Sequence, residues 1–227
     1  MLRAGKIPIG VFVTGTDTGV VKTVVAAALL RGLCDAGLRA VGMKPVAAGV
    51  EPGSAVNADV TALAQAGNVD APLADRNPYA FTAPIAPHLA AGAEGRAIDI
   101  GVIALAYGRL AARSDAVVVE GAGGALVPLD ERRDMLDIAA ALGLPVLLVV
   151  GIRLGCLNHA LLSVLAIRAR GLTLAGWVAN RLQPGLPFAA ANIDTLTRRL
   201  GVAPIATFGV DTPSRFVPDA LRAFEMS

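Results

Sequence analysis

One stretch of the sequence has the layout of a phosphate-binding loop. The residues GTDTGVVKT occupy positions 15–23 behind the apolar run IPIGVFVT, which predicts a strand, a tight turn and a helix beginning at Lys22 and Thr23. In such a loop, backbone N–H groups wrap phosphate, a lysine adds positive charge and a threonine hydroxyl can hold magnesium. The strict pattern G-x-x-x-x-G-K-[ST] fails at both glycines, where Thr16 and Val21 stand. By itself the stretch also fits an ordinary strand–turn–helix junction.

Two charged residues at the ends of other predicted strands could converge on this loop. Lys44 lies in KPV at the end of the predicted strand 40–46, and Glu120 ends the predicted strand 116–120. Because the carboxyl ends of parallel strands share one edge of a sheet, both side chains are expected beside the loop. There a lysine supplies charge and a carboxylate can reach a metal ion. The alternative for Lys44 is a surface lysine with a buried stem.

Three weaker signals each have a functional and a structural interpretation. Asp59, in NAD, is a candidate metal ligand or the N-cap of a helix. Asn180 closes the predicted strand 174–180 and either reads a base edge or occupies a turn. The glycines that follow Glu120 in EGAGG let a ligand approach bare backbone, although glycines are also common in tight turns.

Composition limits the class of protein. Apolar residues make up 55% of the 227 and charged residues 17%, with a net charge of +2 and no cluster of Lys and Arg. We therefore expect one domain spanning 1–227 that binds neither nucleic acid nor a membrane surface. The N-terminus does not resemble a signal peptide. Cys34 and Cys156 are too few for a disulfide framework or a metal site, which favours a cytoplasmic protein.

Short apolar runs alternate with stretches of helical length along the chain. The predicted strands are 9–14, 40–46, 116–120, 145–151, 174–180 and 203–208. The predicted helices are 24–37, 99–113, 157–171 and 189–201. Strands that are continuously apolar indicate a parallel sheet buried on both faces, and the alternation predicts a three-layer α/β/α fold with a mostly parallel, doubly wound sheet.

Three further segments complete the expected organisation. The uncharged stretch 138–152 is too short to span a bilayer and predicts the end of a buried helix followed by a buried strand. Two segments rich in Pro, Gly and small polar residues, 49–57 and 68–92, are predicted as ligand-carrying loops.

Seven motifs in order resemble one family. They are VTGTDT with VKT, GMKPVAAG, NADVTAL, NPYAF with PIAPH, VEGAGG, LGCLNHA and LAGWVAN. Together, over about residues 9–200, they resemble the dethiobiotin synthetases, ATP-dependent carboxylases of biotin biosynthesis in the P-loop NTPase class. The resemblance implies a P-loop NTPase-like fold and MgATP as substrate. It further implies that 7,8-diaminopelargonate and CO2 form a carbamate, that ATP phosphorylates the carbamate with release of ADP, and that the second amine then closes the ring of dethiobiotin and expels phosphate.

The resemblance also implies roles for individual residues. The side chains acting on the transferred phosphoryl group would be Lys22, Lys44 and Thr18. The hard oxygen ligands of Mg2+ would be Thr23, Asp59 and Glu120. Asn180 would recognise adenine. The nucleotide-binding residues would be Gly15, Thr16, Asp17, Thr18, Gly19, Val20, Val21, Lys22, Thr23, Val24, Asp59, Glu120, Asn180 and Arg181.

In this family the active site lies at a homodimer interface. The segment LGCLN, which includes Asn158, would therefore reach the carboxylate chain of a substrate bound in the partner subunit. The substrate-binding residues implied by the resemblance are Lys44, Ala48, Glu120, Gly121, Ala122, Gly123, Gly124, Leu154, Gly155 and Asn158.

The sequence departs from the family pattern at five places. Val21 replaces the glycine of Gly-Lys-Thr, and strain of about 1–3 kcal/mol is expected if the backbone there is one that only glycine tolerates. Gly19 stands where many relatives have an acidic residue, and Ala48 lacks the hydroxyl of the usual KPVASG. Asn192 falls where some relatives have a tyrosine. The tail 205–216 lacks an expected Gly-x-x-Pro turn, so its adenine contacts stay unassigned.

Other interpretations stay open on the sequence alone. A related amidoligase usually carries a glutaminase domain, for which the chain has no room. A partitioning ATPase carries a lysine early in its loop, where Thr14, Thr16 and Asp17 stand. A non-catalytic scaffold is supported only by Val21.

Two single residues are assigned structural roles. For His88 we expect helix capping or packing, and for Arg153 a surface or interface salt bridge.

Overall fold

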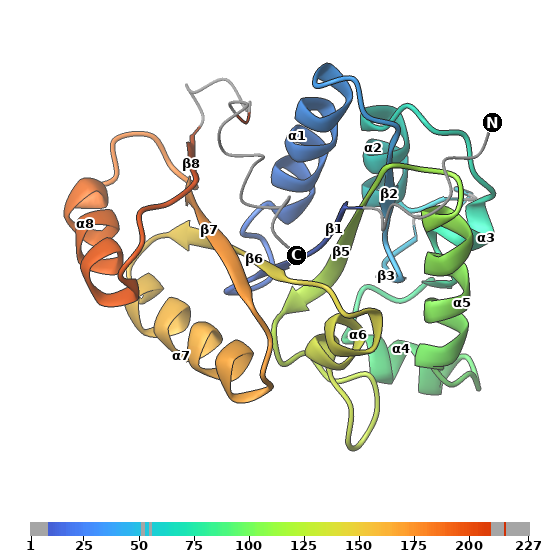
Figure 1. The fold of residues 1–227 in the computed structure, drawn as a ribbon. Helices are drawn as coiled ribbons and strands as arrows, with labels where there is room; N and C mark the ends of the chain where they lie inside the picture. Colours follow the sequence, from blue (N-terminus) through green and yellow to red (C-terminus); the bar gives the residue numbers. More distant parts are fainter. Residues whose placement is uncertain (1–8, 51–52, 55, 210–215, 217–227) are drawn as a thin grey trace.

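The chain folds around a six-stranded parallel sheet with helices on both faces (Figure 1). The computed structural model describes residues 9–50, 53–54, 56–209 and 216. The strand order is β2-β5-β1-β6-β7-β8, and every described pairing between neighbouring strands is parallel. The predicted doubly wound α/β class is thereby confirmed.

The strands and helices of the described residues are as follows. The main sheet contains β1 (Ile9–Gly15), β2 (Ala40–Met43), β5 (Ala116–Gly124), β6 (Val146–Ile152), β7 (Leu174–Arg181) and β8 (Ala206–Phe208). A second, two-stranded sheet contains β3 (Val46–Ala48) and β4 (Tyr79–Phe81). The helices are α1 (Lys22–Asp35), α2 (Ala58–Ala66), α3 (Leu73–Arg76), α4 (Pro87–Ala93), α5 (Ile100–Ala111), α6 (Met135–Leu142), α7 (Cys156–Ala169) and α8 (Ala189–Leu200).

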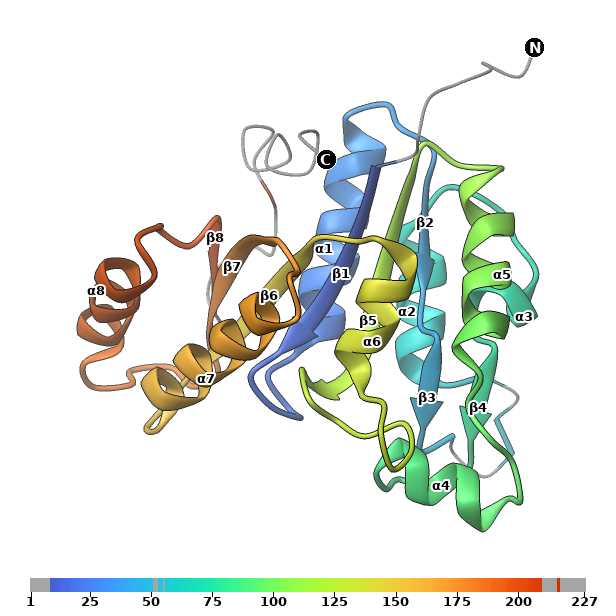
Figure 2. The same ribbon diagram turned by 60° about the horizontal axis from the view of Figure 1, so that its bottom comes forward.

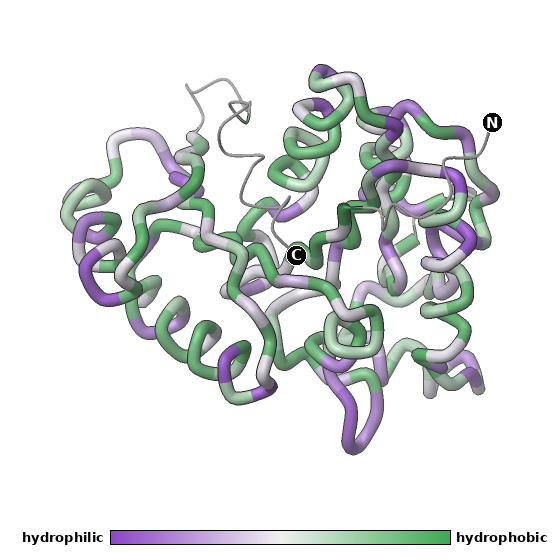
Figure 3. Tube along the Cα trace, viewed as in Figure 1, coloured by the Kyte–Doolittle hydropathy of each residue, from purple (hydrophilic) through white to green (hydrophobic). Residues whose placement is uncertain are grey.

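Alternate residues of the central strands enter cores on opposite faces of the sheet. On β1, Val11 and Val13 pack with the apolar residues of α1. Phe12 instead packs with residues of α5 and α6, such as Ile103 and Ile138. Two faces buried in this way explain why these strands are almost continuously apolar, and Figure 3 shows the hydrophobic residues concentrated along them.

The predicted strand 40–46 is wrong as a single element. Lys44 and Pro45 separate β2 from β3, and β3 pairs with β4 rather than continuing in the main sheet. Proline lacks the N–H that a continuing ladder needs. Figure 2 shows β3 and β4 side by side next to α4. The break leaves Lys44 in the short link between the two sheets.

Several elements were absent from the sequence prediction. The expected loop 68–92 contains α3, β4 and all but the last residue of α4, and α2 was foreseen only through the alternative that Asp59 caps a helix. The strand predicted to end at Glu120 runs on to Gly124, which pairs with Gly15. The helix end expected in 138–152 is confirmed by α6 and the following strand by β6.

Parts of three expectations lie outside the described residues. They are the N-terminal residues 1–8, residues 51–52 and 55 of the loop 49–57, and residues 210–215 of the tail 205–216. Within the described part of the chain, no helix is long and apolar enough to cross a membrane. Both cysteines, Cys34 and Cys156, are free thiols.

Candidate functional site

The predicted phosphate-binding loop, called the phosphate loop below, connects β1 to α1 and contains a strained residue. A side chain at Gly15 would be blocked, since a Cβ built there lies 2.6 Å from Cγ2 of Val20. Gly19 has a positive φ of 75°, and Val21, which precedes α1, has φ 63° and ψ 43°. A β-branched residue in this left-handed region is a genuine outlier. The condition under which strain was expected at position 21, a backbone that favours glycine, is therefore met.

Lys22 is buried at the start of α1, with only 7% of its surface exposed. Its Nζ donates a hydrogen bond to the Asp17 carbonyl oxygen at 3.1 Å. Burial, and then the charge of Lys44, lower the pKa of Lys22 to about 8, against the opposing effect of nearby carboxylates. An anion placed at this ammonium would meet a poorly hydrated positive charge.

Lys44 lies between two carboxylates. Its Nζ is 2.5 Å from Oε1 of Glu120 and 2.9 Å from Oδ2 of Asp59. Burial works to lower the pKa of Lys44, but the charges of Glu120 and Asp59 and their hydrogen bonds outweigh burial and raise it. Burial works to raise the pKa of Asp59, but the ion pair with Lys44 outweighs it and lowers that pKa. Lys44 and Asp59 are therefore both charged at neutral pH.

Three oxygen-bearing side chains meet where a divalent cation would be expected. The Thr23 hydroxyl donates to Oε1 of Glu120 at 2.9 Å, and the ammonium of Lys44 lies between the carboxylates of Glu120 and Asp59. Oε2 of Glu120 is buried and has no hydrogen-bond partner among the described residues. A buried carboxylate oxygen without a partner is unfavourable unless a cation or water meets it. A hydroxyl and two carboxylates fit Mg2+, which keeps several water or phosphate ligands.

Asp59 owes its position to a helix cap. Asn57 caps α2, because its Oδ1 accepts from the backbone N–H of Asp59 at 2.9 Å. Asp59 is therefore the second residue of the helix, and the alternative that it is itself the N-cap is wrong. The Asn57 amide also donates to the carbonyl oxygen of Ala48 at 3.4 Å, which joins α2 to β3.

These groups line one open cleft of about 760 Å³. The predicted site residues that line it are Thr18, Gly19, Val21, Lys22, Thr23, Val24, Lys44, Ala48, Asp59, Glu120, Ala122 and Gly123. The sequence contains only three lysines, and two of them are in this cleft. Such a concentration of charge at one concave place is typical of a functional site.

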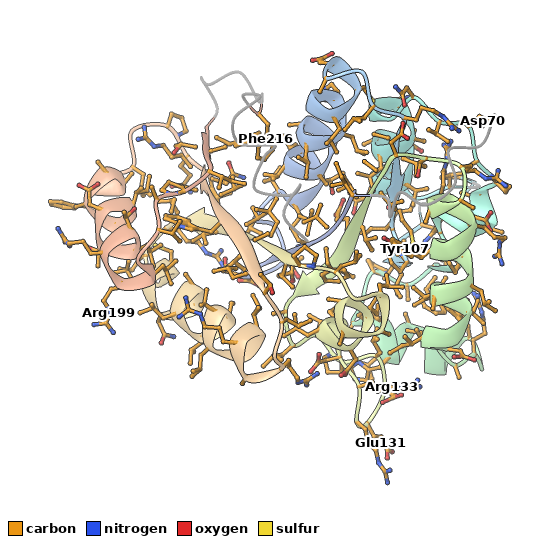
Figure 4. All side chains as sticks on the ribbon, viewed as in Figure 1. Asp70, Tyr107, Glu131, Arg133, Arg199 and Phe216 are labelled. Carbon is orange, nitrogen blue, oxygen red and sulfur yellow. The ribbon has the colours of Figure 1, made fainter. Side chains whose placement is uncertain are left out.

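Other lining residues were not identified from the sequence. They are Ala47, Asn57, Pro84, Ile85, Ala86, Pro87 and Val127. The run 84–87 lies in the segment that was expected to carry ligand, so the signal was present without its residues being assigned. Most of the loop between β5 and α6 projects away from the body, with Glu131 at its tip (Figure 4).

The remaining predicted residues do not line the cleft. Gly15 ends β1, Thr16, Asp17 and Val20 follow it in the phosphate loop, and Gly121 and Gly124 lie at the end of β5. Nδ2 of the buried Asn180 donates to the carbonyl oxygen of Val20 at 2.8 Å and so supports the loop from β7. Arg181 is exposed at the end of β7, whereas Leu154, Gly155 and Asn158 lie around the start of α7.

The two residues assigned structural roles have different outcomes. Arg153 forms an ion pair with Asp17, as a salt-bridging role predicts. For His88, capping is wrong, because α4 has Ala86 at its N-cap and His88 within its first turn, whereas the alternative of packing agrees with a side chain that is half-buried. Nδ1 of His88 is buried and has no partner among the described residues.

Comparison with known proteins agrees with this geometry. Residues 9–209 match the AAA domain family. The ATP-dependent dethiobiotin synthetase BioD of Aromatoleum aromaticum is 52% identical over 200 residues, which cover 85% of this chain and 89% of that protein.

Solved structures support the fold alone. The ParA family ATPase of Chlorobium tepidum is 14% identical, with a TM-score of 0.53 over 96% of this chain and 93% of its own. In the MinC:MinD complex of Aquifex aeolicus, the matching chain is 13% identical, with a TM-score of 0.55 over 95% of this chain and 84% of its own. These structures have the predicted class of fold, a parallel α/β sheet. The 52% identity to the protein of Aromatoleum aromaticum shows that the chain belongs to the ATP-dependent dethiobiotin synthetase family.

Proposed function

We propose that this chain converts 7,8-diaminopelargonate, CO2 and MgATP into dethiobiotin, ADP and phosphate. The observation that carries the proposal is the convergence of Lys22, Lys44, Asp59 and Glu120 on the cleft behind the phosphate loop. A non-catalytic scaffold has no need of four charged side chains at one partly desolvated place, and their retention argues against that alternative.

The two lysines would act by neutralising and aligning the reacting anions. Phosphoryl transfer from ATP to a carbamate brings two negatively charged groups together, so positioned positive charge contributes more than covalent chemistry. Lys22 begins the helix that follows the loop and would contact the transferring phosphate. Lys44, held between Glu120 and Asp59, would lie on the carbamate side. Thr18 lines the same cleft and would assist from within the loop.

The oxygen ligands described above would hold magnesium. Mg2+ bound by Thr23, Asp59 and Glu120 would neutralise charge on the phosphates. The unpartnered Oε2 of Glu120 supports this assignment, since it offers a buried acceptor at the proposed place. Because its Nδ2 is engaged by Val20, Asn180 would recognise adenine through Oδ1.

The binding site for the second substrate, diaminopelargonate, would be completed by a partner subunit. Diaminopelargonate is an aliphatic chain with a carboxylate at one end, and its amines must lie near Lys44 and the glycines of EGAGG. Leu154, Gly155 and Asn158 lie outside the cleft, and Leu154 is fully exposed. Residues in that position support a homodimer in which they would contact substrate bound to the other chain.

A phosphate-release assay with omissions tests the proposal. The chain is incubated with MgATP, bicarbonate and diaminopelargonate, and each is left out in turn, with Lys44→Met as the inactive control. We expect release that requires all three and is lost in the control. Release without diaminopelargonate would indicate a different ATPase, and no substrate-dependent release would favour the scaffold.

A further inference from the structure

The phosphate loop is held by its neighbours in a conformation that its own sequence disfavours. Val21 occupies the left-handed region at φ 63°. Its side chain is 42% exposed, so no close packing around it explains the conformation. Residues in sparsely populated backbone regions persist only where the surroundings over-determine them. The contacts that fix the loop at other residues must therefore stabilise it.

One of these contacts comes from the strand next to β1. Arg153 directly follows β6, which pairs with β1, and its Nη2 is ion-paired with Oδ2 of Asp17. The other carboxylate oxygen of Asp17 accepts from the N–H of Thr18 at 2.7 Å. The carbonyl oxygen of the same residue accepts from Lys22 Nζ at 3.1 Å. Asp17 thus links the charge of Arg153 to the lysine that would meet phosphate.

We infer that Arg153 is a positioning residue that compensates for the missing glycine at position 21. By fixing Asp17, it keeps the loop and Lys22 in the phosphate-binding arrangement in spite of Val21. The inference rests on the proposed function only in taking ATP as the ligand of the loop. It treats Arg153 as coupled to Val21 through the backbone of the loop, by way of Asp17.

The exposure of the pair indicates where its effect should be seen. The side chains of Arg153 and Asp17 are 43% and 45% exposed, and ion pairs of that kind add little to global stability. Their contribution should be confined to the loop. With Val21 present, loss of the ion pair should let the strained loop leave the phosphate-binding conformation. With glycine at position 21, the loop is not strained and should keep that conformation without the ion pair.

A double-mutant cycle tests this coupling. The four chains are the natural one, Arg153→Gln, Val21→Gly and the double variant, and ATP affinity is measured by calorimetry. We expect Arg153→Gln to weaken ATP binding about three- to tenfold with Val21 present and less than about twofold with glycine there, because residues that share a strained backbone are not additive. Arg153→Lys should recover most of the loss. As a control, the exposed Arg198→Gln on α8 should change nothing.

Hydrogen exchange of residues 15–23 without nucleotide gives a second measurement on the same chains. Arg153→Gln should speed exchange in the loop with Val21 and not with glycine, while the thermal unfolding midpoint stays the same. Equal effects in the two backgrounds, in affinity or exchange, would overturn the inference and leave the proposed function standing. If neither the natural chain nor the Val21→Gly variant binds ATP, the proposed function fails, and exchange alone decides the role of Arg153.

Discussion

Val21 is the residue whose replacement says most about the loop. Its left-handed backbone costs about 1–3 kcal/mol relative to an unstrained conformation. Val21→Gly removes that cost and also the side chain that lines the cleft. We therefore expect ATP to bind more tightly to the glycine variant, but because the free loop already adopts the left-handed conformation, the gain should be smaller than the roughly fivefold that 1 kcal/mol paid wholly on binding would give.

Val21→Ala separates the two causes. Alanine keeps a Cβ in the strained region but removes most of the bulk from the cleft. If strain dominates, alanine recovers little of the gain that glycine gives, as calorimetry would show. Equal ATP affinities for the natural chain and Val21→Gly would contradict the explanation.

Lys22 makes a prediction about pH. Its pKa is about 8 in the folded protein against 10.5 ordinarily, with burial as the largest cause. Between these values the unfolded chain binds a proton that the folded protein has released, so the free energy of unfolding attributable to Lys22 rises with pH across that window. Below about pH 8 both states are protonated, and the full cost of burying the ammonium is present.

Side-chain NMR of the protein without nucleotide or magnesium measures this pKa directly. With only three lysines in the sequence, Lys22→Met identifies the signal. A midpoint near pH 8 is expected for Lys22. A midpoint near its ordinary value would show that the ammonium is better solvated than its position indicates.

At the level of elements, the cap of α2 determines where Asp59 lies. Asn57→Ala removes both the cap and the bond to β3. The expected loss is about 0.5–2 kcal/mol in the free energy of unfolding, together with a higher magnesium concentration needed for half-maximal activity. Asn57→Asp retains the capping oxygen and serves as the matched control in denaturant unfolding. If Asn57→Ala left both quantities unchanged, the cap would not be what positions Asp59.

The sequence predicted the elements that have a long apolar pattern and missed those that are too short to show one or that depend on a local cap. Strands such as 145–151 are continuous apolar runs, and only a doubly covered sheet buries them. By contrast, α3 has four residues, and β3 and β4 have three each, too few for periodicity to show. The helix α2 follows an Asx cap, directly after a segment in which Gly and Pro favoured a loop.

Some residues of the candidate site could likewise be predicted from the sequence, and others could not. Lys22, Lys44, Asp59 and Glu120 could be predicted because strand ends converge and the motifs occur in a recognisable order. The contribution of Pro84 and Ile85 to the cleft could not, since it depends on how the small sheet packs against the main one. A salt bridge of Arg153 was expected from the sequence, but its partner Asp17 was not, because that pairing depends on the neighbouring strand.

At the scale of the whole molecule, the site should need two chains. Lys44→Met and Asn158→Ala are each expected to abolish most activity as homodimers. In a hybrid dimer, one site receives both substitutions and the other neither. After mixing and re-equilibration, about one quarter of the natural activity should return, because half of the dimers are hybrids with one intact site each. No recovery would mean that Asn158 acts within its own chain or not at all.

The fate of the bicarbonate carbon atom tests most directly the central claim, that this chain makes dethiobiotin from CO2. The chain is supplied with MgATP, diaminopelargonate and 13C-bicarbonate, and the product is analysed by mass spectrometry alongside ADP and phosphate. We predict dethiobiotin carrying one 13C in its ureido carbonyl, with one ADP and one phosphate for each product molecule. ATP hydrolysis without labelled dethiobiotin would contradict the account.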